Sequence, residues 1–341
     1  MSENMAVHSR DPEGPVINSS ALAARGDALA QLKLDAKQNR EGGMISGRVE
    51  TARRYRLKAE QGDVTAQVIL GELYENGWGV AQDCREAERW YREAAKRGHT
   101  QAAFCLGWMY DFGIGVTQDD IEAMKWYRRA AKSGHARAQV RLGSMYLYGR
   151  GAARPRSRKY AHRQAVMWYR KAADQGDARA FYHLGEMFEH ERGFARSEQQ
   201  VARDYGQAMQ WYRKAAELGD TQAQRCMGSI LSTSRMDHGA VIVGNTREAV
   251  EWYVKAAELG DPWAAYDLAF LYTSGWIFAP PRNYKEALKW CLIAAEMGKD
   301  REDLLKDINF LRIVDIDIEA TPAEVYQAEK LAREWLRERK K

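Results

Sequence analysis

Apolar residues in this chain recur in paired stripes at helical spacing. Between Gly98 and Gly134 the first stripe falls at i, i+4, i+7 and i+8, and the second at i, i+3, i+4, i+7 and i+8. Each spacing places its members on one face of an α-helix. Gly113 and Gly115 lie between the stripes and favour a turn. The stripes comprise Ala102, Leu106, Met109 and Tyr110, and then Ala123, Trp126, Tyr127, Ala130 and Ala131. This segment therefore predicts a helical hairpin.

The hairpin repeats along the chain. Its opening glycine recurs every 36 to 43 residues. Its second stripe carries a Trp-Tyr pair, which is replaced by Trp-Cys in the last hairpin. The glycines are Gly26, Gly62, Gly98, Gly134, Gly176, Gly219, Gly260 and Gly298. Because Trp126 recurs at the same position in five other hairpins, we expect it in the core. The pattern predicts seven hairpins over residues 21–298, the first polar and degenerate, with each hairpin packed on its neighbours.

The ends of the chain differ from the repeats. Residues 1–20 are polar and aperiodic, which predicts disorder. Residues 302–314 predict a further helix, and the run Thr321-Pro322-Ala323-Glu324 is a capping box with proline at the first helical position. We expect residues 299–341 to form capping helices over the last repeat. A partner-binding amphipathic tail is the alternative for this segment.

These motifs resemble the Sel1-like repeat (SLR), a longer relative of the tetratricopeptide repeat. The shared features are the opening glycine, the Leu-Gly pair, the Gly-x-Gly turn and the Trp-Tyr and Ala-Ala pairs, over about residues 26–298. The departures are the first repeat, residues 237–244 in place of a Gly-x-Gly turn, Ala269 and Cys291. The resemblance implies an all-α, right-handed superhelical solenoid of antiparallel helix pairs. It also implies a non-enzymatic adaptor that holds protein partners, as in many bacterial members.

Composition and cysteine placement refine this picture. Hydrophobic residues make up 45% of the chain and charged residues 29%, which is typical of a well-packed helical protein. No stretch is apolar for long enough to predict a membrane span. The four cysteines lie in four separate repeats without a Cys-x-x-Cys motif, which favours the cytoplasm.

Catalytic and cofactor motifs are missing from the sequence, so we predict no enzyme activity and no cofactor. One metal hypothesis competes with this view. His183, Glu186 and His190 are spaced to share a helix face, which would suit a metal-binding or enzymatic protein. The equivalent positions in other repeats vary freely, so we rank this alternative below an adaptor.

A basic insert, residues 150–163, lengthens the turn of one repeat. It contains six basic and no acidic residues, while the whole chain carries a formal charge of +5. The favoured interpretation is a solvated loop between helices, followed by a contact for an acidic protein. A nucleic-acid or anionic-surface binder ranks last, because only Tyr160 in the insert could stack on a base.

A second stripe on each first helix predicts where a partner binds. Positions 3, 7, 10 and 14 after the opening glycine lie away from the core stripe, yet they include arginines and aromatics, which dominate binding hot spots. In tetratricopeptide-like solenoids the first helices line a concave groove, so we expect a partner segment with acidic residues between apolar ones. Packing between repeats explains Trp108 and Phe270 equally well. The candidates are Trp108, Phe112, Arg137, Arg141, Tyr148, Arg179, His183, Trp263 and Phe270. The sequence identifies neither the partner nor the oligomeric state.

Overall fold

The structure is a computed structural model that describes residues 45–151, 157–191, 198–232, 235–237, 240–242, 245–274, 282–312, 316 and 320–339. The disorder predicted for residues 1–20 and the first helix of the hairpin that opens at Gly26 lie outside these residues. The chain forms two compact units, Met1–Trp168 and Tyr169–Lys341, which meet in sequence within helix α9 (Arg158–Ala173).

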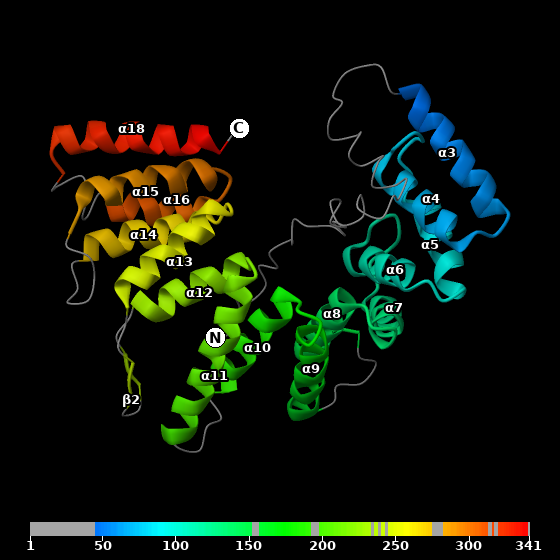
Figure 1. The fold of residues 1–341 in the computed structure, drawn as a ribbon, viewed down its shortest axis with the longest axis horizontal. Helices are drawn as coiled ribbons and strands as arrows, with labels where there is room; N and C mark the ends of the chain where they lie inside the picture. The colour runs from blue at the N-terminus through cyan, green and yellow to red at the C-terminus, as the bar shows by residue number, and fades with distance from the viewer. Residues whose placement is uncertain are drawn as a thin grey trace. The chain divides into compact units, whose positions relative to one another are not determined.

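Unit 1 consists of helical hairpins, and the first helices α4 (Val64–Asn76) and α6 (Thr100–Phe112) each pack on the helix that follows (Figure 1). Its helices before α9 are α3 (Ile45–Glu60), α4 (Val64–Asn76), α5 (Cys84–Lys96), α6 (Thr100–Phe112), α7 (Asp120–Lys132) and α8 (Ala136–Leu147). The predicted core tryptophan, Trp126, is buried there with Trp90 and Trp168.

Unit 2 continues the helix pairs and adds one short strand pair. Its elements after α9 are α10 (Ala178–Glu191), α11 (Glu198–Glu217), α12 (Thr221–Ser232), β1 (Arg235–Asp237), β2 (Ala240–Ile242), α13 (Thr246–Glu258), α14 (Pro262–Ser274), α15 (Tyr284–Met297), α16 (Glu302–Leu311) and α18 (Pro322–Glu338). The antiparallel strands place Met236 opposite Val241. They occupy the turn that lacks the Gly-x-Gly motif. The longer turn leaves the packing of α12 on α13 in place.

Close packing within a repeat explains the Leu-Gly and Trp-Tyr motifs together. In four repeats the glycine of the Leu-Gly pair, or of Met-Gly in one of them, lies against the tyrosine ring of the second helix, at a distance that leaves no room for a Cβ atom. These pairs are Gly71 with Tyr91, Gly107 with Tyr127, Gly185 with Tyr212, and Gly228 with Tyr253. The glycine therefore sets how closely the two helices approach.

In unit 1 the Gly-x-Gly turns join the two helices of one repeat and contact the preceding repeat. Gly115 has φ +69°, and a Cβ atom on it would lie 2.6 Å from the backbone carbon of Cys84 at the start of α5. Gly151 has the same φ, and its Cβ would lie 2.3 Å from the carbonyl oxygen of Asp120 at the start of α7. Only glycine combines this backbone conformation with such a close approach. Each turn therefore seats against the second helix of the preceding repeat.

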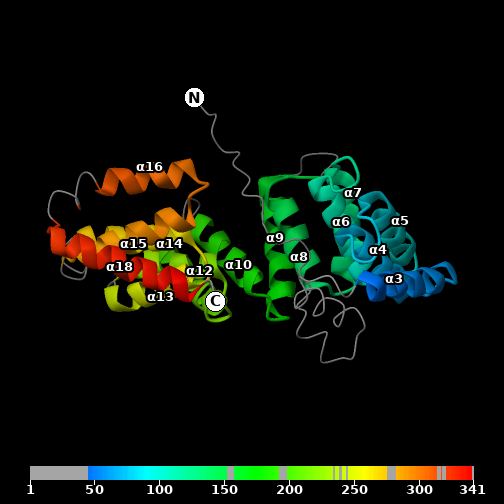
Figure 2. The same ribbon diagram turned by 90° about the horizontal axis from the view of Figure 1, so that it is seen from above.

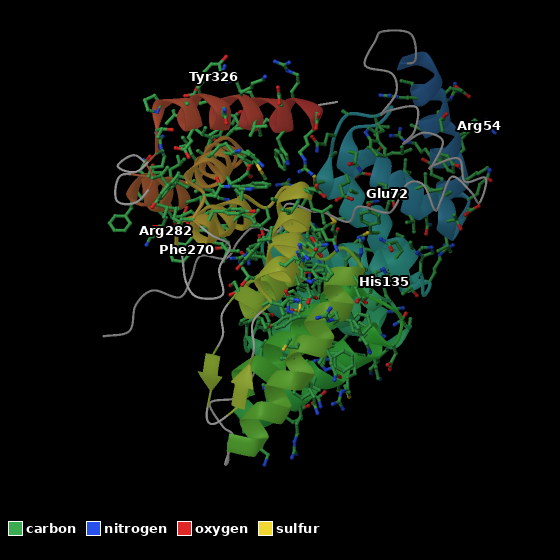
Figure 3. All side chains as sticks on the ribbon, turned by 60° about the vertical axis from the view of Figure 1, so that its left-hand side comes forward. Arg54, Glu72, His135, Phe270, Arg282 and Tyr326 are labelled. Atoms are coloured by element: carbon green, nitrogen blue, oxygen red, sulfur yellow. The ribbon has the colours of Figure 1, made fainter. Side chains whose placement is uncertain are left out.

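The last two helices of unit 2 cover the final hairpin. The predicted capping box is present, because the side chains of Thr321 and Glu324 each accept a hydrogen bond from the backbone N–H of the other residue. Helix α18 packs along α15 (Figures 1 and 2). The rings of Trp290 and Trp335 meet edge to face at 5.7 Å. Tyr326, 70% exposed, lies on the outer side of α18 (Figure 3).

Candidate functional site

A stacked group of three side chains forms the centre of the predicted stripe in unit 1. The guanidinium carbon of Arg141, on α8, lies 4.7 Å from the ring centroid of Trp108 and 5.5 Å from that of Phe112, both on α6. The two rings are 4.2 Å apart. Trp108 is only 5% exposed, whereas Phe112 is 38% exposed. Phe112 is therefore the exposed ring of this group and Trp108 the buried one.

Two further predicted residues extend this group along α8. Arg137 is exposed one turn before Arg141, and Tyr148, at the C-cap of the helix, is 65% exposed. Because residues at i, i+4 and i+11 share a helix face, Arg137, Arg141 and Tyr148 lie on one side of α8. We call Phe112, Arg137, Arg141 and Tyr148 the arginine–aromatic surface.

In unit 2 the predicted residues on α10 are anchored to their neighbours. Nδ1 of His183 lies 2.8 Å from Oε2 of Glu186, and the imidazole stacks on Tyr169 at 4.9 Å. Burial raises the pKa of Asp220, and the nearby Arg179 and His183 oppose that rise. Arg179 and His183 are thus half-buried and part of a polar cluster.

The predicted aromatics on α14 differ from each other in exposure. Trp263 is half-buried against Tyr266, with ring centroids 6.1 Å apart. Phe270 is 49% exposed (labelled in Figure 3). Between them lies Asp267, whose carboxylate is 3.9 Å from the guanidinium of Arg225. The stripe on α14 therefore combines an acidic side chain with aromatic ones, whereas the stripe on α8 carries Arg137 and Arg141.

The metal hypothesis gains no support from the part of the chain that the structure describes. Within those residues, no three His, Cys, Asp or Glu side chains group closely enough to hold a metal ion. Nδ1 of His183 is taken by Glu186, and the side chain of His190 lies outside the described residues.

The basic insert differs from the loop that the sequence predicts. Arg154 and Arg156 lie outside the described residues, but α9 begins at Arg158, so the end of the insert is helical. Ser157 starts this helix by accepting a hydrogen bond from the N–H of Tyr160 at 3.3 Å. The Tyr160 ring also packs edge to face on Tyr146 at 6.4 Å. These two contacts stabilise the extra helical turns.

Arg150, the first residue of the insert, has a structural role that the sequence did not predict. Its guanidinium donates to Oδ1 of Asp111 at 2.6 Å and to Oδ2 of Asp120 at 3.1 Å. Asp111 is 3% exposed and also accepts from the hydroxyl of Tyr127 at 3.1 Å. These contacts join residues 30 and 39 positions apart, which no local spacing reveals.

The repeats identify the family. The Sel1 repeat matches residues 64–99, 100–135, 136–177, 178–220, 230–261 and 264–299. The chain belongs to the Sel1 repeat family. Members of this family generally act as scaffolds for protein–protein interaction and are generally non-enzymatic. The predicted degenerate hairpin before residue 64 is not among the matched repeats.

Solved structures similar to this chain include another Sel1 repeat protein. A Sel1 repeat protein from Oxalobacter formigenes is 28% identical with a TM-score of 0.58, over 74% of this chain and 97% of that one. A protective antigen of uropathogenic Escherichia coli with an SLR fold, c5321, is 25% identical with a TM-score of 0.35, over 94% and 78%. The immunity protein Pa5087 from Pseudomonas aeruginosa is 18% identical with a TM-score of 0.43, over 73% and 85%. No match was found among curated proteins.

The described helices of this Sel1 repeat protein were also compared with the length and apolarity that a bilayer requires. None of them is both long and apolar enough to cross a membrane.

Proposed function

We propose that this Sel1 repeat protein is a non-enzymatic adaptor that binds an acidic segment of a protein partner on the arginine–aromatic surface of unit 1. The observation that carries the proposal is the stacking of Arg141 on Trp108 and Phe112. The scaffold role of the family supports it. The cytoplasm is the compartment we propose, as the cysteine distribution favours.

The stack prepares Arg141 to recognise a carboxylate. A guanidinium held flat over aromatic rings keeps its N–H groups at its edges, where a carboxylate binds them in a bidentate manner. Because the rings already restrict the side chain, Arg141 loses less rotamer entropy on binding than a free arginine. The exposed edge of Phe112 offers an apolar contact beside it. The surface therefore suits an acidic residue next to an apolar one.

Arg179, His183, Trp263 and Phe270 form a second, weaker candidate surface in unit 2. Phe270 is the exposed apolar side chain of this group. His183 in this group already faces the carboxylate of Glu186, whose negative charge would disfavour the acidic ligand that Arg141 attracts. We therefore assign the main contact to unit 1.

Selection of short random peptides on the immobilised full chain tests the proposal. We expect the selected peptides to combine Asp or Glu with aromatic or aliphatic residues. Arg141→Glu should weaken their binding by about thirtyfold, the size of a hot-spot loss, and Arg141→Gln by a smaller factor. Arg89→Glu is the matched control, because Arg89 also stacks on a tryptophan, Trp90, at 5.1 Å, but on a second helix.

Circular dichroism and melting temperature establish that each variant is folded. If the selected peptides bind folded Arg141→Glu as tightly as the unchanged protein, the arginine–aromatic surface is not the binding site. The same conclusion follows if Arg89→Glu weakens binding equally.

A further inference from the structure

Acidic residues are missing from the whole middle of the chain, well beyond the basic insert. Residues 123–173 contain 14 Lys and Arg and no Asp or Glu. The other 290 residues carry 38 basic and 47 acidic side chains, a formal charge of −9. The positive charge of this protein is therefore concentrated in one segment, and a count over residues 150–163 alone misses most of it.

Helix α9 presents three of these charges along one exposed face. Lys159, Arg163 and Arg170 are exposed and lie on one face at i, i+4 and i+11. None of the three forms an ion pair with a described residue. The line they form extends about 17 Å, at 1.5 Å per residue. Val166 lies half-buried within it.

Neighbouring second helices of unit 1 pair several of their exposed cations with carboxylates of the same helix. On α5, Arg89 pairs with Glu86 at 3.2 Å and Lys96 with Glu93 at 2.9 Å. On α7, Lys125 pairs with Glu122 at 3.0 Å. Since these pairs are missing from the exposed line of α9, its positive potential is available to an incoming anion.

We infer that this face of α9 docks a helical, acidic segment of a partner protein. The cations recur at helical spacing around an apolar residue, so a helix with carboxylates at matching turns and an apolar side chain between them complements the face. Met167, 36% exposed at the edge of the line, adds apolar contact. Duplex nucleic acid gains its affinity from many phosphate contacts, and single strands need exposed rings for stacking. The Tyr160 ring is instead engaged by Tyr146.

This inference does not rest on the proposed function, because it concerns side chains separate from the arginine–aromatic surface. The probe is a synthetic helical peptide with Glu at i, i+4 and i+11 and Leu at i+7. Its binding to the full chain is measured by fluorescence anisotropy at low and at physiological salt. A duplex DNA of similar charge serves as the competing probe. We expect the peptide to bind and its affinity to fall with added salt.

The variant Lys159→Glu with Arg163→Glu should weaken peptide binding about tenfold or more at low salt. Lys159→Glu places a carboxylate in the first turn of α9, where it favours the helix dipole, and Arg163 is exposed one turn later, so this variant should remain folded. The matched control is Arg85→Glu with Arg89→Glu on α5, which has the same spacing, exposure and charge change. Peptide binding to this control should change less than about threefold.

Three results would overturn the inference. Equal weakening by the two variants would mean that net charge alone attracts the peptide. Tighter binding of the DNA, lost in the α9 variant, would make α9 a nucleic-acid surface. An absence of peptide binding at low salt would rule out an acidic helix as the occupant.

Discussion

A Cβ atom on Gly107 would lie 2.5 Å from Cδ1 of Tyr127, closer than any side chain can approach. The glycine is on the first helix of its repeat and the tyrosine on the second. In the last repeat Ala269 stands at the glycine position and Cys291 at the tyrosine position, and both are fully buried. The larger first residue is therefore matched by a smaller second one. These two departures from the repeat pattern form one compensated pair.

Gly107→Ala should lower the free energy of unfolding by about 1–3 kcal/mol, the cost of overpacking a core. Urea unfolding followed by circular dichroism measures it. In a Tyr127→Cys background, which reproduces the pair of the last repeat, the same change should cost little. Equal costs in the two backgrounds would show that the ring is not what excludes the methyl group.

Gly206→Ala is the matched control for this prediction. Gly206 also lies inside a helix, α11, and a Cβ atom there would meet no neighbour within 4 Å. Alanine should therefore stabilise the helix by about 0.5–1 kcal/mol. Changes of opposite sign in the free energy of unfolding would separate the effect of packing from that of helix propensity.

Trp126→Ala should cost about 3–5 kcal/mol, because a large aromatic leaves the core. Repeats in a solenoid stabilise their neighbours, so protection from hydrogen exchange should also fall in the adjacent hairpins. Nε1 of Trp126 is buried without a hydrogen-bond partner in the described residues, so Trp126→Phe loses no bond there. That variant should cost only about 1 kcal/mol. An unchanged melting temperature for Trp126→Ala would contradict the core assignment.

Arg150→Ala should destabilise the protein by about 3 kcal/mol, because it leaves the buried carboxylate of Asp111 without its cation. Adding Asp111→Asn to this variant should recover part of the loss. Arg163→Ala, an exposed change nearby, should stay within about 0.5 kcal/mol. Chemical unfolding of the unchanged protein, Arg150→Ala, Asp111→Asn and the double variant gives the coupling energy, and strictly additive costs would argue against the ion pair.

His135 should make stability fall in mild acid. Burial, with some help from Arg137, lowers its pKa in the folded protein from 6.5 to about 4. The imidazole accepts the N–H of Ala138 at 3.2 Å and stacks on Phe104 at 4.5 Å. Below pH 6.5 the unfolded chain binds a proton that the folded protein refuses until about pH 4, so the free energy of unfolding decreases across this range. The loss reaches about 3 kcal/mol at most.

His135→Asn tests this pH dependence, because asparagine can cap the helix but does not titrate in this range. Unfolding free energies measured from about pH 7 to pH 4 should show a shallower slope in this variant. If this variant keeps the original slope, His135 does not control the acid response.

The sequence alone determined the repeated hairpins and much of their cores. The positions of Leu106 and Trp126 follow from helical spacing, since a stripe at 3.6-residue period must face the core. The cap at Thr321 was equally predictable, because its hydrogen bonds join residues three positions apart. Such features depend on local geometry that the order of residues contains directly.

Only the tertiary structure decided which side of a helix a neighbouring repeat covers. Trp108 and Arg141 both belong to the stripe that the sequence assigns to a partner, yet Arg141 covers Trp108 and leaves Phe112 exposed. Arg150 belongs by sequence to a basic loop, yet it neutralises a buried carboxylate of the preceding repeat. These contacts join residues 30 or more positions apart. Their geometry depends on how closely successive helices approach each other. Glycine–tyrosine packing sets that distance in three dimensions, and it cannot be read from the helical periodicity of the sequence.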